Sequence, residues 1–304
     1  MVDVGAIIIN GAISGAVFSL LALGFTLIYG VSGVVNLAHG VFFMLGAYMF
    51  SSFSSLLGEE VEGILVVSPL ALLLSVILAA ITVAIVAAIV YKLAIGPVIE
   101  DEVAVLVVTV SIAIVFQQII LLLFTPAFHP VPSLLRGYTI FWGLTLTYQR
   151  VMSFVVSLVL FAILWIFIAK TKIGGAMRAV SQDREVAMLM GVNTERLYML
   201  TMAISGAFAA IAGIFIASTT TGVANAFMWL EPLALSFSIV ILGGLGSIKG
   251  TIVGGFIIGY SEIIVTTIYP EIGAIVPAVP FGIMLLVLTI RPKGLFGKRI
   301  EMEE

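Results

Sequence analysis

Long apolar runs separated by short polar stretches make up most of this sequence. A helix needs about 20 apolar residues to cross a hydrocarbon layer of about 30 Å. Apolar runs near that length lie at residues 6–29, 40–57, 64–91, 103–124, 150–169, 198–218, 232–248, 251–268 and 276–290. The pattern therefore predicts an all-α fold, a polytopic transmembrane helical bundle with about 8–9 spans.

The charges between these runs predict how the chain lies in the membrane. Cytoplasmic loops carry an excess of Lys and Arg. With nine spans, all of the 13 basic residues except Arg136 and Arg150 fall on one side, while the acidic stretch 59–62 falls on the other. A count of eight or ten spans would mix the charges. We therefore expect the N-terminus outside and the C-terminus in the cytoplasm, with run 6–29 retained because no basic residue precedes it.

Composition narrows the class of protein further. Hydrophobic residues make up 62% of the 304 residues and charged residues only 10%, whereas a soluble domain has about 25% charged residues. We expect a single transmembrane domain over residues 1–304, with one long cytoplasmic loop at about 170–197. The net charge of −3 argues against nucleic acid as a partner, because nucleic acid needs a basic surface.

The sequence offers no obvious place for a cofactor or a metal. It has no cysteine, and its two histidines, His39 and His129, fall on opposite sides of the predicted membrane. The glycine-rich stretch 243–251 is not a phosphate-binding loop, because Lys249 precedes Gly250 instead of following a glycine. We expect no nucleotide site, no metal site and no cofactor in this chain.

A short helix is predicted inside the cytoplasmic loop. Ser181 suits the N-cap, Asp183 and Glu185 suit the first turn, and Gly191 suits the position just past the end. The apolar residues share one face: Val186, Leu189 and Met190. A helix this short is marginal alone in water, so it needs a surface to pack on. The residues alone leave three surfaces open: the membrane, the inner ends of the same protein, or a separate cytoplasmic protein.

Polar residues within the spans are candidates for a translocation pathway. Glu262 lies well inside the run 251–268, and both a pathway role and a structural hydrogen bond between helices remain open for it. Asn36 and His39 lie at a glycine-rich break between the first two spans, where hydrogen bonding at the inner end is the alternative to a pathway role. Weaker candidates are Gln117, Gln118, Asn225 and Glu231.

Glycines spaced four apart predict close helix packing. Such spacing occurs at Gly11 and Gly15, at Gly255 and Gly259, and along Gly246, Gly250 and Gly254. The hairpins at 16–46 and 234–259 are weakly similar, which suggests an internal repeat. The external stretch 125–149, rich in proline and aromatic residues, is either an interfacial loop or a docking surface.

Four segments in order along the chain resemble the permease subunits of ABC transporters for branched-chain amino acids, the Liv type. They are 29–40 with 44–48, 175–179 with 182–185 and 189–193, 242–259 with Glu262, and 291–297. The chain departs from that family at 96–102, where Glu100, Asp101 and Glu102 stand in place of a basic stretch. The resemblance therefore gives no role to that loop.

The resemblance implies a permease subunit of an ATP-driven importer in the plasma membrane, moving branched-chain or similar small amino acids by alternating access. The implied partners are two ABC ATPase subunits, a second permease subunit (a copy or a paralogue), an extracytoplasmic solute-binding protein and membrane lipid. ATP hydrolysis would belong to the ATPases, so the chain itself is not expected to be an enzyme. The loop helix would be the ATPase-coupling helix, with residues Ser181, Gln182, Asp183, Arg184, Glu185, Val186, Leu189, Met190 and Gly191.

Two alternatives compete with this interpretation. A secondary transporter or channel would normally carry more membrane-embedded charges, whereas Glu262 is the only acid well inside a predicted span. A membrane enzyme would gather catalytic groups at one depth, which Glu262, His39 and Asp183 do not do in this topology.

Overall fold

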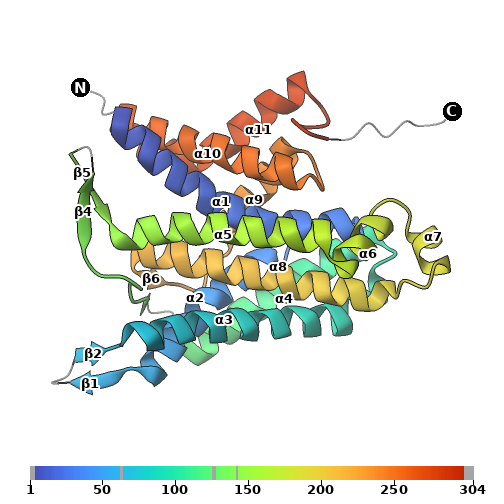
Figure 1. The fold of residues 1–304 in the computed structure, drawn as a ribbon, viewed down its shortest axis with the longest axis horizontal. Coiled ribbons are helices and arrows are strands. Elements are labelled where there is room, and N and C mark those ends of the chain that lie inside the picture. The colour runs from blue at the N-terminus through green and yellow to red at the C-terminus, as the bar shows by residue number, and fades with distance from the viewer. Residues whose placement is uncertain (1–3, 62–63, 125–127, 142, 298–304) are drawn as a thin grey trace.

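Helices form almost all of the computed structural model, which describes residues 4–61, 64–124, 128–141 and 143–297 (Figure 1). The helices long and apolar enough to cross a membrane are α1 (Val4–Ser32), α2 (His39–Leu57), α3 (Pro69–Val90), α4 (Glu102–Phe124), α5 (Tyr148–Lys170), α8 (Thr194–Ile216) and α10 (Ile248–Ile268). Two shorter apolar helices follow the same pattern, α9 (Leu230–Gly243) and α11 (Val279–Ile290). Each predicted span corresponds to one of these helices, which confirms the predicted helical bundle.

Short strands gather at one end of the bundle, here called the strand end (Figure 1). They form three antiparallel pairs: β1 (Glu59–Val61) with β2 (Ile64–Val66), β3 (His129–Pro130) with β6 (Val223–Ala224), and β4 (Tyr138–Phe141) with β5 (Leu144–Thr147). The predicted run 64–91 therefore begins as a strand, and its helix starts only at Pro69, behind the N-cap Ser68. The opposite end carries α6 (Lys172–Val180) and α7 (Arg184–Leu189) and is called the basic end.

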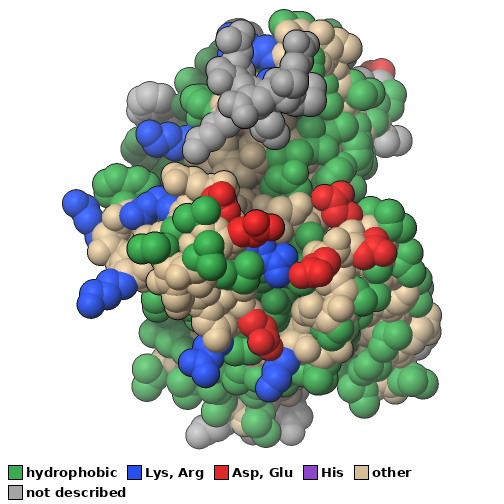
Figure 2. Space-filling model, turned by 90° about the vertical axis from the view of Figure 1, so that its right-hand side faces the viewer, with side chains coloured by type: hydrophobic (Ala, Val, Ile, Leu, Met, Phe, Trp, Pro, Cys, Tyr) green, Lys and Arg blue, Asp and Glu red, His purple; other side chains and the backbone are tan. Residues whose placement is uncertain are grey.

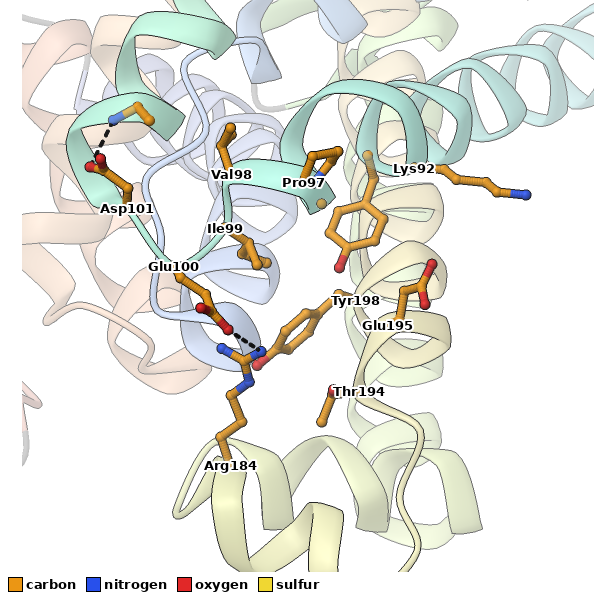
Figure 3. Close-up of a pocket in the computed structure, with 13 residues that line it drawn as sticks. Lys92, Pro97, Val98, Ile99, Glu100, Asp101, Arg184, Thr194, Glu195 and Tyr198 are labelled. Atoms are coloured by element: carbon orange, nitrogen blue, oxygen red, sulfur yellow. Dashed lines mark hydrogen bonds and ion pairs between the residues drawn. The ribbon is translucent and has the colours of Figure 1, made fainter.

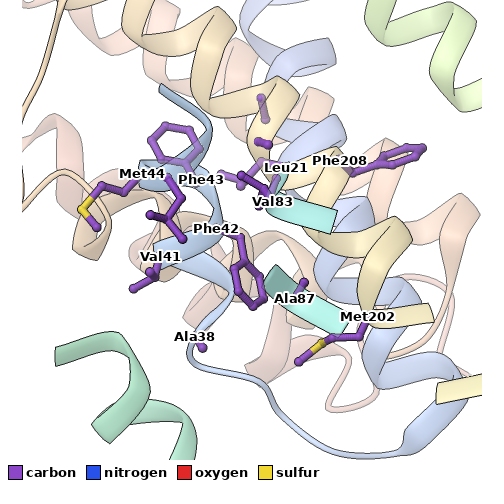
Figure 4. Close-up of a cluster of buried hydrophobic side chains, with 14 of the residues drawn as sticks. Leu21, Ala38, Val41, Phe42, Phe43, Met44, Val83, Ala87, Met202 and Phe208 are labelled. Atoms are coloured by element: carbon purple, nitrogen blue, oxygen red, sulfur yellow. The ribbon is translucent and has the colours of Figure 1, made fainter. Parts of the chain in front are cut away.

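The helices divide into a buried centre and an outer layer. Helices α2 and α8 are 61% buried over their most apolar stretch, whereas α4 and α5 are only 22% buried. In the centre, large side chains of α2 pack against α1, α3 and α8. Examples are Phe42 of α2, Leu21 of α1, Val83 of α3 and Phe208 of α8 (Figure 4). Because apolar side chains need no burial in lipid, the exposed faces of α3, α4 and α5 suit contact with the membrane or with another subunit.

Glycines bring α1 and α10 into close contact, as their spacing predicted. A Cβ atom on Gly15 would lie 2.8 Å from the Cα atom of Phe256, and a Cβ atom on Gly259 would collide with the backbone at Gly15. The hydroxyl groups of Thr26 and Thr251 lie 2.6 Å apart between the same helices. The turns of the two similar hairpins also meet, because a Cβ atom on Gly30 would lie 3.3 Å from the Cα atom of Gly246.

Helices α2 and α9 both begin part-way through the bundle. The ring nitrogen Nε2 of His39, the first residue of α2, lies 3.0 Å from the carbonyl oxygen of Leu21, near the middle of α1. The start of α9 abuts the start of α2, because a Cβ atom on Gly40 would lie 2.5 Å from the carbonyl oxygen of Trp229. Non-helical backbone at this depth is tolerated where protein surrounds it. The two helices then run in opposite directions from this shared point.

Candidate functional site

The cytoplasmic loop predicted at 170–197 forms two helices instead of one. Helix α6 ends at Val180 and is followed by its C-cap Ser181, whose hydroxyl donates to the carbonyl oxygen of Arg178 at 2.9 Å. Helix α7 begins behind Asp183, whose carboxylate accepts from the Val186 N–H at 2.9 Å. The prediction that Ser181 is the N-cap is therefore wrong, because α6 uses Ser181 to close its own last turn. Gly191 follows α7 with a φ of 86°, which confirms its predicted place past the helix end.

Helix α6 anchors this region to the bundle. The hydroxyl of Thr171 accepts from the Gly174 N–H at 3.0 Å, and Gly174 packs against the carbonyl groups of residues 167 and 168. Met177 and Val180 are buried. The absence of a side chain at Gly174 allows α6 to fold back closely on the end of α5.

Helix α7 lies at the basic end (Figure 1), where it exposes apolar side chains. Leu189 is 86% exposed and Met190, just past the helix, is 81% exposed. Val186 and Met188 are also exposed, while Ala187 is the buried residue of α7. The sequence left three surfaces open for this helix to pack on. One of them, the inner ends of the same chain, does not cover this apolar face. Exposed apolar groups that cluster in this way are typical of a contact with a partner.

A cavity of about 610 Å³ lies beside α7 at the basic end. Its walls are the α3–α4 connection, the start of α7 and the start of α8, and they include Tyr91, Glu100, Arg184, Glu195 and Tyr198 (Figure 3). Figure 2 shows acidic side chains gathered in the middle of this face, with most basic side chains towards its edge. The acidic stretch that departed from the resembled family therefore lies next to the predicted coupling segment.

His39 and Asn36 lie in protein interior. His39 is fully buried, and its second ring nitrogen lies 3.3 Å from the Ser205 hydroxyl. The Asn36 side-chain oxygen accepts from the Ala38 N–H at 3.1 Å and so satisfies a backbone group just before α2. The expected inner-end position of His39 is wrong, because α2 begins near the middle of α1. This geometry favours the structural alternative for both residues.

Two carboxylates lie on the neighbouring helices α9 and α10. Glu262 is half-buried on α10, and Glu231, in the first turn of α9, is exposed and acts on Glu262 electrostatically. No side-chain hydrogen bond joins Glu262 to another helix among the described residues. Gln117, by contrast, accepts from the indole N–H of Trp229 at 2.7 Å and so ties α4 to the start of α9.

The sequence prediction placed one member of these sites, Glu231, only among the weaker candidates, and it missed another, Glu100. It gave Glu100 no role because the partner of Glu100, Arg184, is 84 positions away in the sequence. The signal available for Glu100 was the acidic stretch itself, which stands out against the basic residues of the same predicted side.

These features define a class: a multi-pass α-helical membrane protein with an exposed apolar segment at its basic end. The chain belongs to the family described as branched-chain amino acid transport system / permease component, whose model matches residues 7–288. The predicted membership of a Liv-type permease family is thereby confirmed.

Individual relatives agree over nearly the whole chain. It is 27% identical to the high-affinity branched-chain amino acid transport system permease protein BraD of Pseudomonas aeruginosa, over 96% of this chain and 95% of that protein. It is 30% identical to the permease protein LivH of the corresponding system of Salmonella typhimurium, over 95% of this chain and 94% of that protein. These relatives are permease subunits of transport systems, and they do not favour a stand-alone secondary transporter or channel.

One solved structure shares the fold. It is PsaBC from Streptococcus pneumoniae in complex with Fab, with a TM-score of 0.51 and 13% sequence identity, over 94% of this chain and 92% of that chain. At this identity the likeness concerns the fold alone.

Proposed function

We propose that this chain forms half of the translocation pathway of an ATP-driven importer for branched-chain or similar small amino acids. Two ATPase subunits, a second permease subunit and an extracytoplasmic solute-binding protein complete the assembly in the lipid bilayer. ATP hydrolysis takes place in the ATPases, and alternating access of the permease pair carries the solute inward. The family and its full-length relatives support the substrate class, and the α7 surface supports the ATP-driven mechanism.

The observation that carries this proposal is the exposed apolar face of α7. The coupling segment runs from Ser181 to Gly191, and Leu189 and Met190 are the side chains with most surface free to enter a cleft of the ATPase. Asp183 and Glu185 set the start of the helix, while Arg184 faces the bundle. A few well-buried side chains dominate the binding energy of most protein interfaces.

We also assign Glu262 and Glu231 to the pathway. A charge in lipid costs about 2.5–3.5 kcal/mol at the bilayer centre, so an exposed carboxylate part-way through the bundle faces water or another subunit. A carboxylate pair suits the ammonium group that every amino acid carries. Asn36 and His39 support the pathway indirectly in this proposal, by holding the buried start of α2.

Replacing Leu189 with Asp tests the ATPase contact. Removing a central apolar contact at an interface costs about 2 kcal/mol or more, so binding of the ATPase should weaken about 30-fold or more. We expect the Leu189→Asp variant to insert normally, to lose co-purification with the ATPases and to lose uptake in proteoliposomes.

The matched control is Leu56→Asp. Leu56 is 78% exposed at the strand end, so the same change there should leave ATPase binding intact. Equal ATPase binding by the Leu189→Asp variant and the unchanged protein would rule out α7 as the docking element.

A further inference from the structure

The side chain of Arg184 turns back towards the bundle, unlike the apolar side chains of α7. Its Nη2 atom lies 3.5 Å from Oε1 of Glu100, in the α3–α4 connection. Its guanidinium carbon lies 5.9 Å from the centre of the Tyr198 ring, in the first turns of α8. Figure 3 shows Arg184 and Glu100 meeting across the cavity with Tyr198 beside them. Arg184 therefore contacts the bundle instead of continuing the exposed apolar face.

A second contact extends this group to the start of the α3–α4 connection. The Tyr198 ring meets the Tyr91 ring edge-on, with their centres 6.3 Å apart. Tyr91 is buried and is the first residue after α3. We call Arg184, Glu100, Tyr198 and Tyr91 the Arg184 cluster. It joins α7 and α8 to the α3–α4 connection.

The α3–α4 connection is an irregular joint. It consists of a π-helical turn at Tyr91–Ile95 and a 3₁₀ turn at Gly96–Val98. The Asp101 carboxylate then caps α4 by accepting from the N–H groups of Val103 and Ala104, each at 3.0 Å. Single π-helical turns interrupt the regular hydrogen-bond ladder and occur often at functional sites. A force on Glu100 therefore acts at the irregular connection between α3 and α4.

Helix α7 has few other links to the helices of the bundle. Ala187 is its buried residue, and its neighbours along the chain are α6 and the segment leading to α8. Among the residues that the structure describes, the pair of Arg184 and Glu100 is the one ion pair between α7 and the bundle. It connects α7 to the α3–α4 connection, 84 positions earlier in the sequence. The segments next to α7 along the chain do not make this link.

We propose that Arg184 is a positioning residue that passes the movement of α7 to the α3–α4 connection through Glu100. This inference rests on the proposed role of α7 as the ATPase contact. It gives a function to Glu100 in the acidic stretch at 100–102, for which the family resemblance offered none. Because an exposed ion pair adds little to folding stability, removing it should leave the protein folded and should weaken the link between ATP hydrolysis and transport.

Exchanging the two charges tests the proposal. The complete complex is reconstituted in proteoliposomes with Arg184→Glu, with Glu100→Arg and with both changes together, and the solute moved per ATP hydrolysed is measured. Since neighbouring residues couple by amounts equivalent to about 2- to 150-fold, we expect each single variant to lower this ratio at least about 3-fold. The double variant should return to within about 2-fold of the unchanged protein.

Glu102→Arg is the matched control. Glu102 is exposed on the same stretch, at the first residue of α4, and forms no ion pair among the described residues. A loss of coupling in this control equal to that of Glu100→Arg would overturn the proposal, because the effect would then be one of local charge. So would a double variant that is no better than either single variant.

Co-purification of the ATPases separates this proposal from the function on which it rests. We expect all three charge variants to retain the ATPases. If Arg184→Glu alone lost them, Arg184 would be an ATPase contact and not a link to Glu100, which overturns this inference and leaves the proposed function standing. Solute movement that needs no ATPase would overturn both.

Discussion

Capping residues decide where the coupling segment begins. Ser181 and Asp183 are both good N-cap types, and they lie two positions apart, so the sequence does not distinguish between them. The structure uses Asp183, because α6 extends as far as Val180. Local propensity could not reveal this, since the fold-back of α6 depends on contact between Gly174 and the backbone of α5. Gly191, in contrast, was predictable, because its positive φ favours glycine.

Replacing Asp183 with Ala should loosen α7. Loss of an N-cap costs about 0.5–2 kcal/mol of helix stability, and α7 is too short to tolerate that loss without its partner. We expect faster hydrogen exchange at the amides of Val186 and Ala187 and weaker ATPase binding. Ser181→Ala is the control and should leave exchange in α7 unchanged. Faster exchange in both variants to the same degree would contradict the assignment of Asp183 as the cap.

Replacing Glu262 with Gln should lower transport without lowering the stability of the protein. The change removes a charge that is costly in the membrane, so the thermal stability of the purified protein should hold or rise. A hydrogen bond to a charged group contributes about 1.5–3 kcal/mol, so uptake should fall about 10- to 100-fold if Glu262 contacts the ammonium group of the solute.

Glu271→Gln is the control for this change, because Glu271 is exposed beyond the strand-end terminus of α10. Uptake by Glu262→Gln at the rate of this control would place Glu262 outside the pathway.

The lengths and order of the helices could be predicted from the apolar runs, but the depth of α2 and α9 could not. Runs 40–57 and 232–248 are long enough to suggest full spans. Their helices begin mid-bundle because Gly40 packs on the carbonyl of Trp229, a contact between segments far apart in the sequence. The same limit explains why His39 was expected at the inner end. Spacing alone did predict the glycine contact of α1 with α10, because four-residue glycine spacing marks one helix face.

Alanine substitutions at two glycines should change the stability of the protein in opposite directions. One glycine lies in the contact of α1 with α10, and the other lies outside it. Gly259→Ala should destabilise the protein by about 1–3 kcal/mol, because the new methyl group meets the backbone of α1 at Gly15. Gly282→Ala in α11 has no atom within 4 Å of its new methyl group, so it should be neutral or stabilise by up to about 1 kcal/mol. Thermal unfolding of the two purified variants in detergent checks both signs. Equal stability of the two variants would show that α1 and α10 do not pack this closely.

The chain forms a helical bundle whose most exposed apolar residues at the basic end lie in α7 and just past its end. Helices α1, α2 and α8 form its buried centre, while α3, α4 and α5 leave their outer faces open to lipid or to a second permease. The division of basic residues between the two ends was predictable from the sequence, since it depends only on the number of crossings. The Arg184 cluster was not predictable, because its four residues come from two distant stretches of the chain, 91–100 and 184–198.

We propose that this bundle moves solute only when ATPase subunits act on α7. The most direct test measures uptake of a radiolabelled branched-chain amino acid into proteoliposomes containing the permease pair and binding protein, with and without the ATPases and ATP. On this proposal we expect accumulation against a gradient with ATPases and ATP, and only background uptake when either is left out. Solute movement by the permease without the ATPases, in either direction across the membrane, would contradict it.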